Sequence, residues 1–397
     1  MNRYIKHIVL SLVLVITGAS AVNAQRGGMK VVKTMIPVHY KGGLAAGNTI
    51  IAYGTGINTG VDFIKAGDTK GRGILGGERF RATGFAVAGD KVVFIDNSEF
   101  TYHVFDGATG RVTDLPGLQN RGASALQASG NYVLAITHNR RTNKEGVAVI
   151  DLSGNEPSVM EVPLPKGVVR VSQAAIDAAS GYLAVTDGYE KVGGYLFTSG
   201  DAEPFAHDIS DTSGIFNEPM AMANGNLYYF DHKSGIHSVY ELNLRTGAKQ
   251  KLGVNPATFL AAAGGGTVAY FVRRDAKDMN GTEARLVVIK KGGAPVILVT
   301  TDKFIDGSTK NNGLMGIGNK IAITPDGKYV FISGADSIGA TEILQYYDGN
   351  GVKLVSDSIS STKPKALGGS DVTASSSIAA FKIGSNNDTS LAYINLK

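Results

Sequence analysis

Polar and charged side chains recur directly after short apolar runs of this chain, where a strand would end. They are Asp96, Asp187, Asp231, His138, His232, Arg273 and Lys382. A second set precedes such runs and comprises Arg81, Arg121, Arg170, Asn217 and Glu218. Arginine presents a planar fork of donors that fits a carboxylate or a phosphate. Three arginines at comparable positions of a repeat would line one side of a funnel, so the two sets together predict a site for an anionic ligand.

The same residues also allow acid–base chemistry. Abstraction of a proton next to a carboxylate needs a neutralising cation and a base whose pKa lies near the working pH. His138 or His232 would then be the base, and one of the three arginines would hold the carboxylate. A structural interpretation stays open, since an Asp or Arg in a loop often only caps a turn. We expect structural roles for His103 and His237, which lie in or beside outer strands.

Motifs for metals and cofactors are weak. The chain has no cysteine, which excludes disulfides and thiolate metal sites. GTGINTG at 54–60 resembles a phosphate-cradling loop, but a strand-like run follows it where a dinucleotide site needs a helix. DAKDMNGTE at 275–283 is spaced somewhat like a calcium loop, yet the first and last ligands of an EF-hand would fall on Ala276 and Val287. We therefore predict no cofactor, with a looser calcium site as the alternative.

The elements that must position these residues are short strands. Eight apolar runs, rich in β-branched and aromatic residues, each follow a turn residue such as Gly, Asn, Asp or Ser. They are TIIAYG from Thr49, KVVFID from Lys91, YVLAIT from Tyr132, YLAVTD from Tyr182, NLYYFD from Asn226, TVAYFV from Thr267, KYVFIS from Lys328 and SIAAFK from Ser377. Their near-continuous apolarity predicts burial on both faces.

Each apolar run belongs to a longer repeating unit. A small-residue run such as FAVAGD precedes it, and an alternating run such as FTYHVFDG and a more polar one such as RVTDLPG follow. The unit recurs at intervals of roughly 40 to 60 residues, and propeller blades of four strands repeat every 40–50 residues or so. The sequence therefore predicts an all-β fold, a single β-propeller of eight four-stranded blades, with seven blades as the alternative.

The two ends of the chain predict how this ring closes. The last unit stops after its third strand, LAYINLK, and KVVKTMIPV near the N-terminus is a spare strand that would complete it. Closure of this kind removes exposed sheet edges. One hairpin, ITPDGKYVFIS at 323–333, resembles the strand–PDG–strand hairpin of bacterial propellers such as TolB-like and YVTN-type (WD40-like) repeat proteins. That resemblance implies an exported propeller and says almost nothing about function.

Residues 1–24 have the pattern of a secretory signal peptide. Arg3 and Lys6 precede an apolar run from Ile8 to Ile16, and small residues lead up to Ala24. The apolar run is too short to span a bilayer. We expect a leader over 1–24, a propeller domain over 25–397, a periplasmic or secreted bacterial location, and no membrane span after cleavage. Loss of Arg3 and Lys6 lowers the net charge from +5 to +3, a bias too weak to indicate nucleic-acid binding.

These features favour a monomeric binding protein. Its loop face around the central channel would hold a small anionic molecule, a glycan or a protein of the cell envelope, because channel mouths are where propellers usually bind. One alternative is a lyase or hydrolase acting on an acidic saccharide-like substrate. Another is a protein-interaction scaffold of the TolB-like kind. No catalytic motif is visible in the sequence, so binding is the preferred prediction.

Overall fold

A computed structural model gives the structure of the chain in separate stretches. The residues it describes are 29–39, 42–56, 60–68, 70–73, 82–96, 98–118, 121–164, 166, 168, 170–187, 191–198, 205–208, 220–233, 236–254, 256–273, 284–299, 320–335, 342–350, 352–355, 370–385 and 388–397.

The described residues are almost entirely strands, which group by their position in the sheets. The innermost strands are β2 (Leu44–Ala46), β6 (Ala82–Ala88), β10 (Arg121–Ser129), β14 (Gln173–Asp177), β18 (Met220–Ala223), β22 (Pro256–Ala262), β26 (Lys320–Ile323) and β30 (Ser370–Ala374). The second strands are β3 (Ile50–Gly54), β7 (Lys91–Asp96), β11 (Tyr132–Asn139), β15 (Tyr182–Thr186), β19 (Asn226–Lys233), β23 (Val268–Arg273), β27 (Val330–Ala335) and β31 (Ile378–Ser385).

The third strands are β4 (Val61–Lys65), β8 (Thr101–Asp106), β12 (Lys144–Asp151), β16 (Lys191–Leu196), β20 (Ile236–Asn243), β24 (Ala284–Ile289), β28 (Glu342–Tyr347) and β32 (Asp388–Asn395). The outermost strands are β5 (Arg72–Gly73), β9 (Val112–Asp114), β13 (Ser158–Val162), β17 (Phe205–Asp208), β21 (Lys249–Val254), β25 (Val296–Val299), β29 (Val352–Leu354) and β1 (Val31–Pro37). A short 3-10 helix, η1 (Pro116–Leu118), follows β9.

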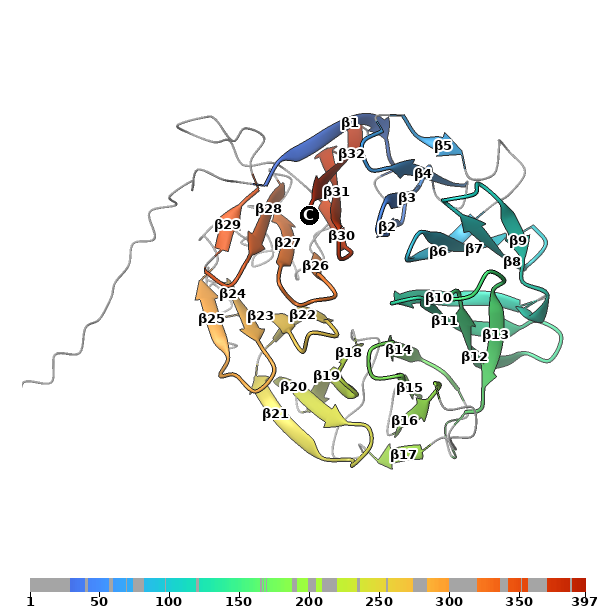
Figure 1. The fold of residues 1–397 in the computed structure, drawn as a ribbon. Coiled ribbons are helices and arrows are strands. Elements are labelled where there is room, and N and C mark those ends of the chain that lie inside the picture. Colours follow the sequence, from blue (N-terminus) through green and yellow to red (C-terminus); the bar gives the residue numbers. More distant parts are fainter. Residues whose placement is uncertain are drawn as a thin grey trace, which may run out of the picture.

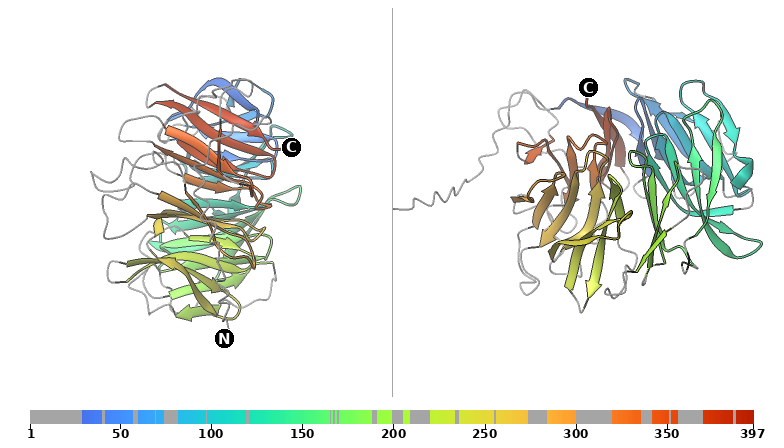
Figure 2. Two further views of the ribbon diagram at one scale, coloured as in Figure 1. Left: turned by 90° about the vertical axis from the view of Figure 1, so that its left-hand side faces the viewer. Right: turned by 60° about the horizontal axis from the view of Figure 1, so that its bottom comes forward.

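Within the described residues these strands form eight antiparallel sheets of four strands each. In seven of them the four strands follow one another along the chain, as in β10-β11-β12-β13. The sheets stand around a common centre with their first strands innermost (Figure 1), and the side views show strands running across the thickness of the ring (Figure 2). This arrangement is a β-propeller, so the predicted all-β class and the four-stranded unit are confirmed.

The ring is closed by pairing the N-terminal strand with the C-terminal one. The eighth sheet has the order β1-β32-β31-β30, and Val32 stands opposite Tyr393 in its register. The buried hydroxyl of Thr34 donates to the carbonyl of Leu391 at 2.7 Å, and the amide of Val38 donates to the carbonyl of Thr389 at 2.9 Å. Figure 1 shows the blue β1 lying along the red β32. The predicted role of the N-terminal strand is therefore confirmed.

The hydrophobic core is divided into layers between neighbouring sheets. One layer packs Leu134 and Ile136 of β11 against Leu183 and Val185 of β15. Similar apolar layers lie between other neighbouring sheets. The second strands are buried on both faces, since every residue of Ile50–Gly54 is buried. A second strand that contacts a neighbour on each side needs apolar residues at successive positions, which explains the near-continuous runs in the sequence.

Tight turns join the innermost strand of each sheet to the second. Between β18 and β19 both Asn224 and Gly225 have positive φ, 53° and 74°. This is the type I′ geometry whose twist matches two antiparallel strands, and Asn-Gly is the pair that adopts it most easily. The turns also contact one another around the ring: the amide of Gly225 donates to Asp177 Oδ2 at 3.2 Å, from one sheet to the next. This hydrogen bond connects two neighbouring sheets at this edge of the ring.

In the part of the chain that the structure describes, no helix has the length and apolarity needed to cross a membrane.

Candidate functional site

The second strand of each sheet ends at the same edge at which the innermost strand begins, because the two are antiparallel. His138 lies near the end of β11, where it stands opposite Gly122 of β10 on one side and Glu145 of β12 on the other. Residues directly opposite in such a pair have their side chains on one face. The side chain of His138 is half-buried and lies on the face of Leu134 and Ile136, towards the β14–β17 sheet.

Glu145 connects this sheet to the strand that leads into the next one. Its Oε2 accepts a hydrogen bond from the amide of Val171 at 2.8 Å. Its Oε1 lies 3.8 Å from Nε of Arg170, whose side chain is 71% exposed. Glu145 thus stands opposite His138 in the strand register. Its carboxylate also accepts a hydrogen bond from the backbone before β14 and forms an ion pair with Arg170. His138 and Arg170, which the sequence analysis assigned to the anionic site, are therefore both neighbours of Glu145.

The turn between His138 and Glu145 is strongly basic. This basic turn, residues 139–144, contains Arg140, Arg141 and Lys144, all of them exposed. Its backbone is ordered by Asn139, whose Oδ1 accepts hydrogen bonds from the amides of Arg141 and Thr142 at 3.0 and 3.1 Å. The turn is therefore a defined structure that presents three exposed cations at the edge of the sheet where Glu145 contacts Arg170.

One of these cations is held in place by an aromatic ring. The Cζ atom of Arg140 lies 3.4 Å from the ring centroid of Phe100, which precedes β8 in the neighbouring sheet. Phe100 itself has a positive φ of 53°. A guanidinium stacked on a ring gains cation–π energy and keeps its in-plane donors available for an anion. The stack also connects the β6–β9 sheet to the β10–β13 sheet at this edge.

Two predicted carboxylates organise turns. Asp96, at the end of β7, is buried and accepts hydrogen bonds from the amide and the hydroxyl of Ser98, at 2.8 and 2.5 Å. Asp187 follows β15 and accepts a hydrogen bond from the amide of Lys191 at 3.2 Å. The Asp96 geometry is that of an Asx turn, and Asp187 closes the longer loop between β15 and β16.

Other predicted residues are described by their backbone alone. Arg121 is the first residue of β10 and pairs with Asn139, so its backbone lies beside the basic turn. Asp231 stands opposite Ser238 and His232 opposite His237 between β19 and β20. Arg273 ends β23 opposite Ala284. Arg81, Asn217 and Glu218 lie outside the described residues, as does the 275–283 segment considered for calcium.

Sequence reasoning missed Glu145 and the basic turn. The run HNRRTNKE between two apolar strands was their signal, but charges in a turn usually belong to a solvated hairpin. Only the cross-strand register places Glu145 opposite His138. No cluster of three or more histidine or acidic side chains suited to a metal ion occurs in the described part of the chain.

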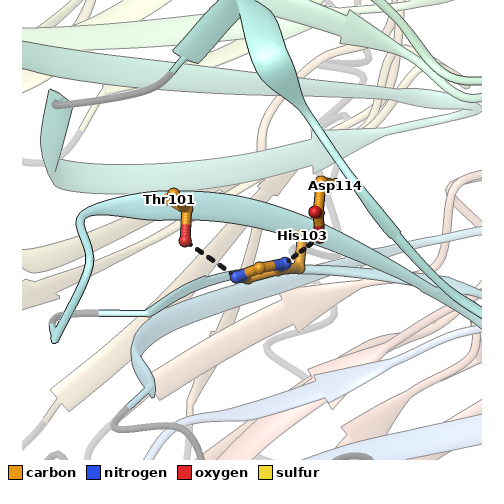
Figure 3. Close-up of polar contacts among 3 residues, drawn as sticks. All are labelled: Thr101, His103 and Asp114. Carbon is orange, nitrogen blue, oxygen red and sulfur yellow. Dashed lines mark hydrogen bonds and ion pairs between the residues drawn. The ribbon is translucent and has the colours of Figure 1, made fainter.

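A separate hydrogen-bond network surrounds the buried His103 (Figure 3). Its Nδ1 lies 2.9 Å from Asp114 Oδ1, and its Nε2 lies 2.9 Å from Thr101 Oγ1. Because a carboxylate only accepts, Nδ1 carries the proton in the neutral ring and Nε2 accepts from the threonine hydroxyl. The order carboxylate–imidazole–hydroxyl is that of a catalytic triad. The ring, however, is buried and stacks on Phe94 with centroids 5.1 Å apart, which fits the structural role expected for this histidine.

No family model matches the sequence, and no curated protein matches it. Solved structures with a similar fold include a mitotic checkpoint complex chain (12% identity, TM-score 0.48, covering 82% of this chain and 96% of that one). They also include oligogalacturonate lyase from Vibrio parahaemolyticus (11% identity, TM-score 0.44, covering 81% and 91%) and the tricorn protease (11% identity, TM-score 0.41, covering 86% and 36%). The chain thus spans about a third of the tricorn protease chain. These similarities concern the β-propeller fold alone.

Proposed function

We propose that this chain is an exported binding protein for an anionic ligand, and that each of its eight described sheets is one blade of the propeller. The observation that carries the proposal is a group of exposed cations at one edge of the β10–β13 sheet. Arg140, Arg141 and Lys144 lie on the basic turn, and Arg170 lies beside Glu145 at the end of that turn. We call these four side chains, together with the half-buried His138, the basic edge.

The charge of the basic edge favours a ligand with several negative groups. Single ion pairs on an exposed surface contribute only about 0–1 kcal/mol each. A ligand with one carboxylate would therefore bind weakly, whereas one that engages three or four cations at once sums these small terms. Arg140, already stacked on Phe100, loses little side-chain freedom when it binds. Acidic glycans and polyphosphates share the required chemistry, which is a row of closely spaced anionic groups.

Glu145 organises this edge and does not cancel its charge. Its two oxygens are used by the amide of Val171 and by Arg170, so its negative charge lies on the sheet side of the turn. The three cations of the basic turn are exposed. With four cations and one carboxylate among these residues, the basic edge favours an anion.

The enzyme alternative rests on one observation, the position of His138 opposite Glu145. A histidine next to a carboxylate is the usual arrangement of a general base, and an arginine on the same carboxylate could hold an acidic substrate. Against this, Arg170 is largely exposed, and water weakens the electrostatic stabilisation that such chemistry needs. Binding without turnover is therefore the preferred function.

The experiment that tests this proposal is a thermal-shift screen of the purified protein. The panel contains oligogalacturonate, sulfated oligosaccharide and polyphosphate, with the neutral oligosaccharides of the same length as controls. A ligand at 100 times its Kd stabilises the folded state by about 2.7 kcal/mol. We expect a rise in Tm with one or more of the anionic compounds, and a smaller rise at high salt because exposed charges are screened.

Two results would overturn the proposal. One is equal stabilisation by an anionic oligosaccharide and its neutral counterpart. The other is no stabilisation by any member of the panel. Release of an unsaturated or shortened product from a stabilising oligosaccharide, absent in His138→Ala, would replace the binding function by the enzyme alternative.

A further inference from the structure

The outermost strand of the β22–β25 sheet differs from the other strands on the rim of the ring. Among the described strands β25 pairs only with β24, and it is the last strand of its sheet. Val296 and Ile297 in it are 42% and 56% exposed. They stand opposite the buried Val288 and Val287, and therefore lie on opposite faces of the sheet. The edge offers an extended backbone and an apolar side chain on each face.

The other outermost strands carry the charges that normally protect such an edge. Lysine or another charged residue on an edge strand discourages pairing with a foreign strand. The charged residues are Lys33 in β1, Arg72 in β5, Asp114 in β9, Glu161 in β13, Asp208 in β17, Lys249 and Lys251 in β21, and Lys353 in β29. The sequence of β25, VILV, has no charge.

The β24–β25 hairpin also differs in charge from the outer strand pairs of the other sheets, because it carries only positive charges. Residues 284–299 include Arg285, Lys290 and Lys291 and no acidic residue. Each of the other seven outer pairs of strands has at least one acid within a strand. They are Asp62, Asp106, Glu161, Asp208, Glu241, Glu342 and Asp388. Lys290 and Lys291 are exposed in the turn that leads into β25.

We propose that β25 is a docking edge for an extended segment of a partner protein that combines apolar and acidic residues. The segment would add a fifth strand to the β22–β25 sheet, with its backbone pairing to β25 and its apolar side chains beside Val296 and Ile297. Its acidic residues would lie near Lys290 and Lys291. A second copy of this chain fits less well, because edge-to-edge pairing would join two hairpins that both carry only positive charge.

This surface lies in a different sheet from the basic edge, so the two proposals stand independently. A random library of short displayed peptides tests it without knowledge of the partner. We expect the protein to select peptides in which β-branched residues alternate with polar ones and acids flank them. A selected peptide, made synthetically and labelled, should bind more than about tenfold more weakly to Ile297→Lys.

The matched control is Met35→Lys, since Met35 is 95% exposed on β1, the outermost strand of another sheet. It should bind the labelled peptide as the unchanged protein does. Lys290→Glu with Lys291→Glu should weaken binding and make it less sensitive to salt. Thermal unfolding of each variant establishes that it is folded, which is expected because these side chains are exposed.

Three outcomes would overturn the proposal. The first is the absence of any enriched peptide class. The second is selection of peptides that bind Ile297→Lys as tightly as the unchanged chain. The third is a dimer in sedimentation that Ile297→Lys converts to monomer, because β25 would then be occupied by a second copy.

Discussion

Lys382 Nζ lies 2.9 Å from Asp371 Oδ2 at the place where the first and last sheets meet. The lysine side chain is 1% exposed, and its ammonium also donates to the carbonyl of Gly42, which precedes β2. Asp371 adopts a positive φ of 53° in β30, where the register of the sheet shifts by one residue. One buried cation thus connects the C-terminal sheet to the N-terminal part of the chain, and it completes the ring beside the β1–β32 pairing.

Replacement of Lys382 by Met should destabilise the fold by about 3–5 kcal/mol, because it leaves the Asp371 carboxylate without its buried partner. Chemical denaturation at neutral pH measures the change. Lys166→Met, at an exposed lysine in the loop after β13, is the control and should change the unfolding free energy by less than about 0.5 kcal/mol. The double variant Lys382→Met with Asp371→Asn should recover part of the loss. A single variant as stable as the control would show that the pair contributes nothing to ring closure.

Removal of residues 1–37 should lower Tm and produce oligomers. The deletion takes away β1 and exposes the long edge of β32, which can then pair with another chain. Removal of residues 1–28 leaves β1 whole and should change neither property. A peptide of residues 29–39 added in excess should restore the monomer. If the longer deletion unfolds at the temperature of the shorter one, the N-terminal strand does not hold the ring closed.

The His103 network should respond unequally to substitution of its members. His103→Leu removes a buried donor and leaves Thr101 without its partner, which should cost about 1–3 kcal/mol. Asp114 is 79% exposed, so Asp114→Asn should cost less than about 1 kcal/mol. Urea unfolding measures both. Ester hydrolysis by the unchanged protein that disappears in Thr101→Val would contradict the structural role and indicate a working triad.

Asp326 in the PDG turn should make the free energy of unfolding depend on pH in the acidic range. Although partial burial raises its pKa, the hydrogen bonds from the Thr324 hydroxyl and the Lys328 amide outweigh this and lower the pKa of Asp326. Its contribution is therefore complete above the unfolded pKa of about 3.9 and is lost as the pH falls through the lower folded value. Because Asp326 is exposed and water screens its charge, Asp326→Asn should cost less than about 1 kcal/mol at neutral pH, and less still as the pH falls below about 4. Glu156→Gln, at an exposed acid, serves as the control, and a pH-independent difference would contradict the assignment.

The fold could be predicted because its signals are local and repeated. KVVFID and its counterparts are apolar at successive positions since a second strand contacts neighbours on both faces, and all but the first residue of Lys91–Asp96 is buried. The spare strand near the N-terminus was recognisable because the last unit stops one strand short. Both inferences need only the pattern along the chain, and the structure agrees with them.

The candidate site was harder to predict from the sequence, because it depends on contacts between residues that are distant along the chain. Lys382 was grouped with the polar residues that follow the apolar runs, and its side chain is buried against Asp371 and a carbonyl about 340 residues earlier in the chain. Asp96 was grouped with the ligand-binding residues, and in the structure its buried carboxylate accepts hydrogen bonds from Ser98. Glu145 gains its position from the register of two strands, which the sequence pattern does not specify to a single residue.

Titration of the purified protein with the most stabilising anionic compound is the measurement that tests the central proposal most directly. It compares the unchanged chain with Arg141→Ala on the basic turn and with Arg111→Ala, an exposed arginine in the neighbouring sheet. We predict that Arg141→Ala weakens binding by roughly fivefold to tenfold, as expected for about 1 kcal/mol, and that Arg111→Ala leaves Kd unchanged. Equal affinity of all three proteins would contradict the assignment of anion binding to the basic edge.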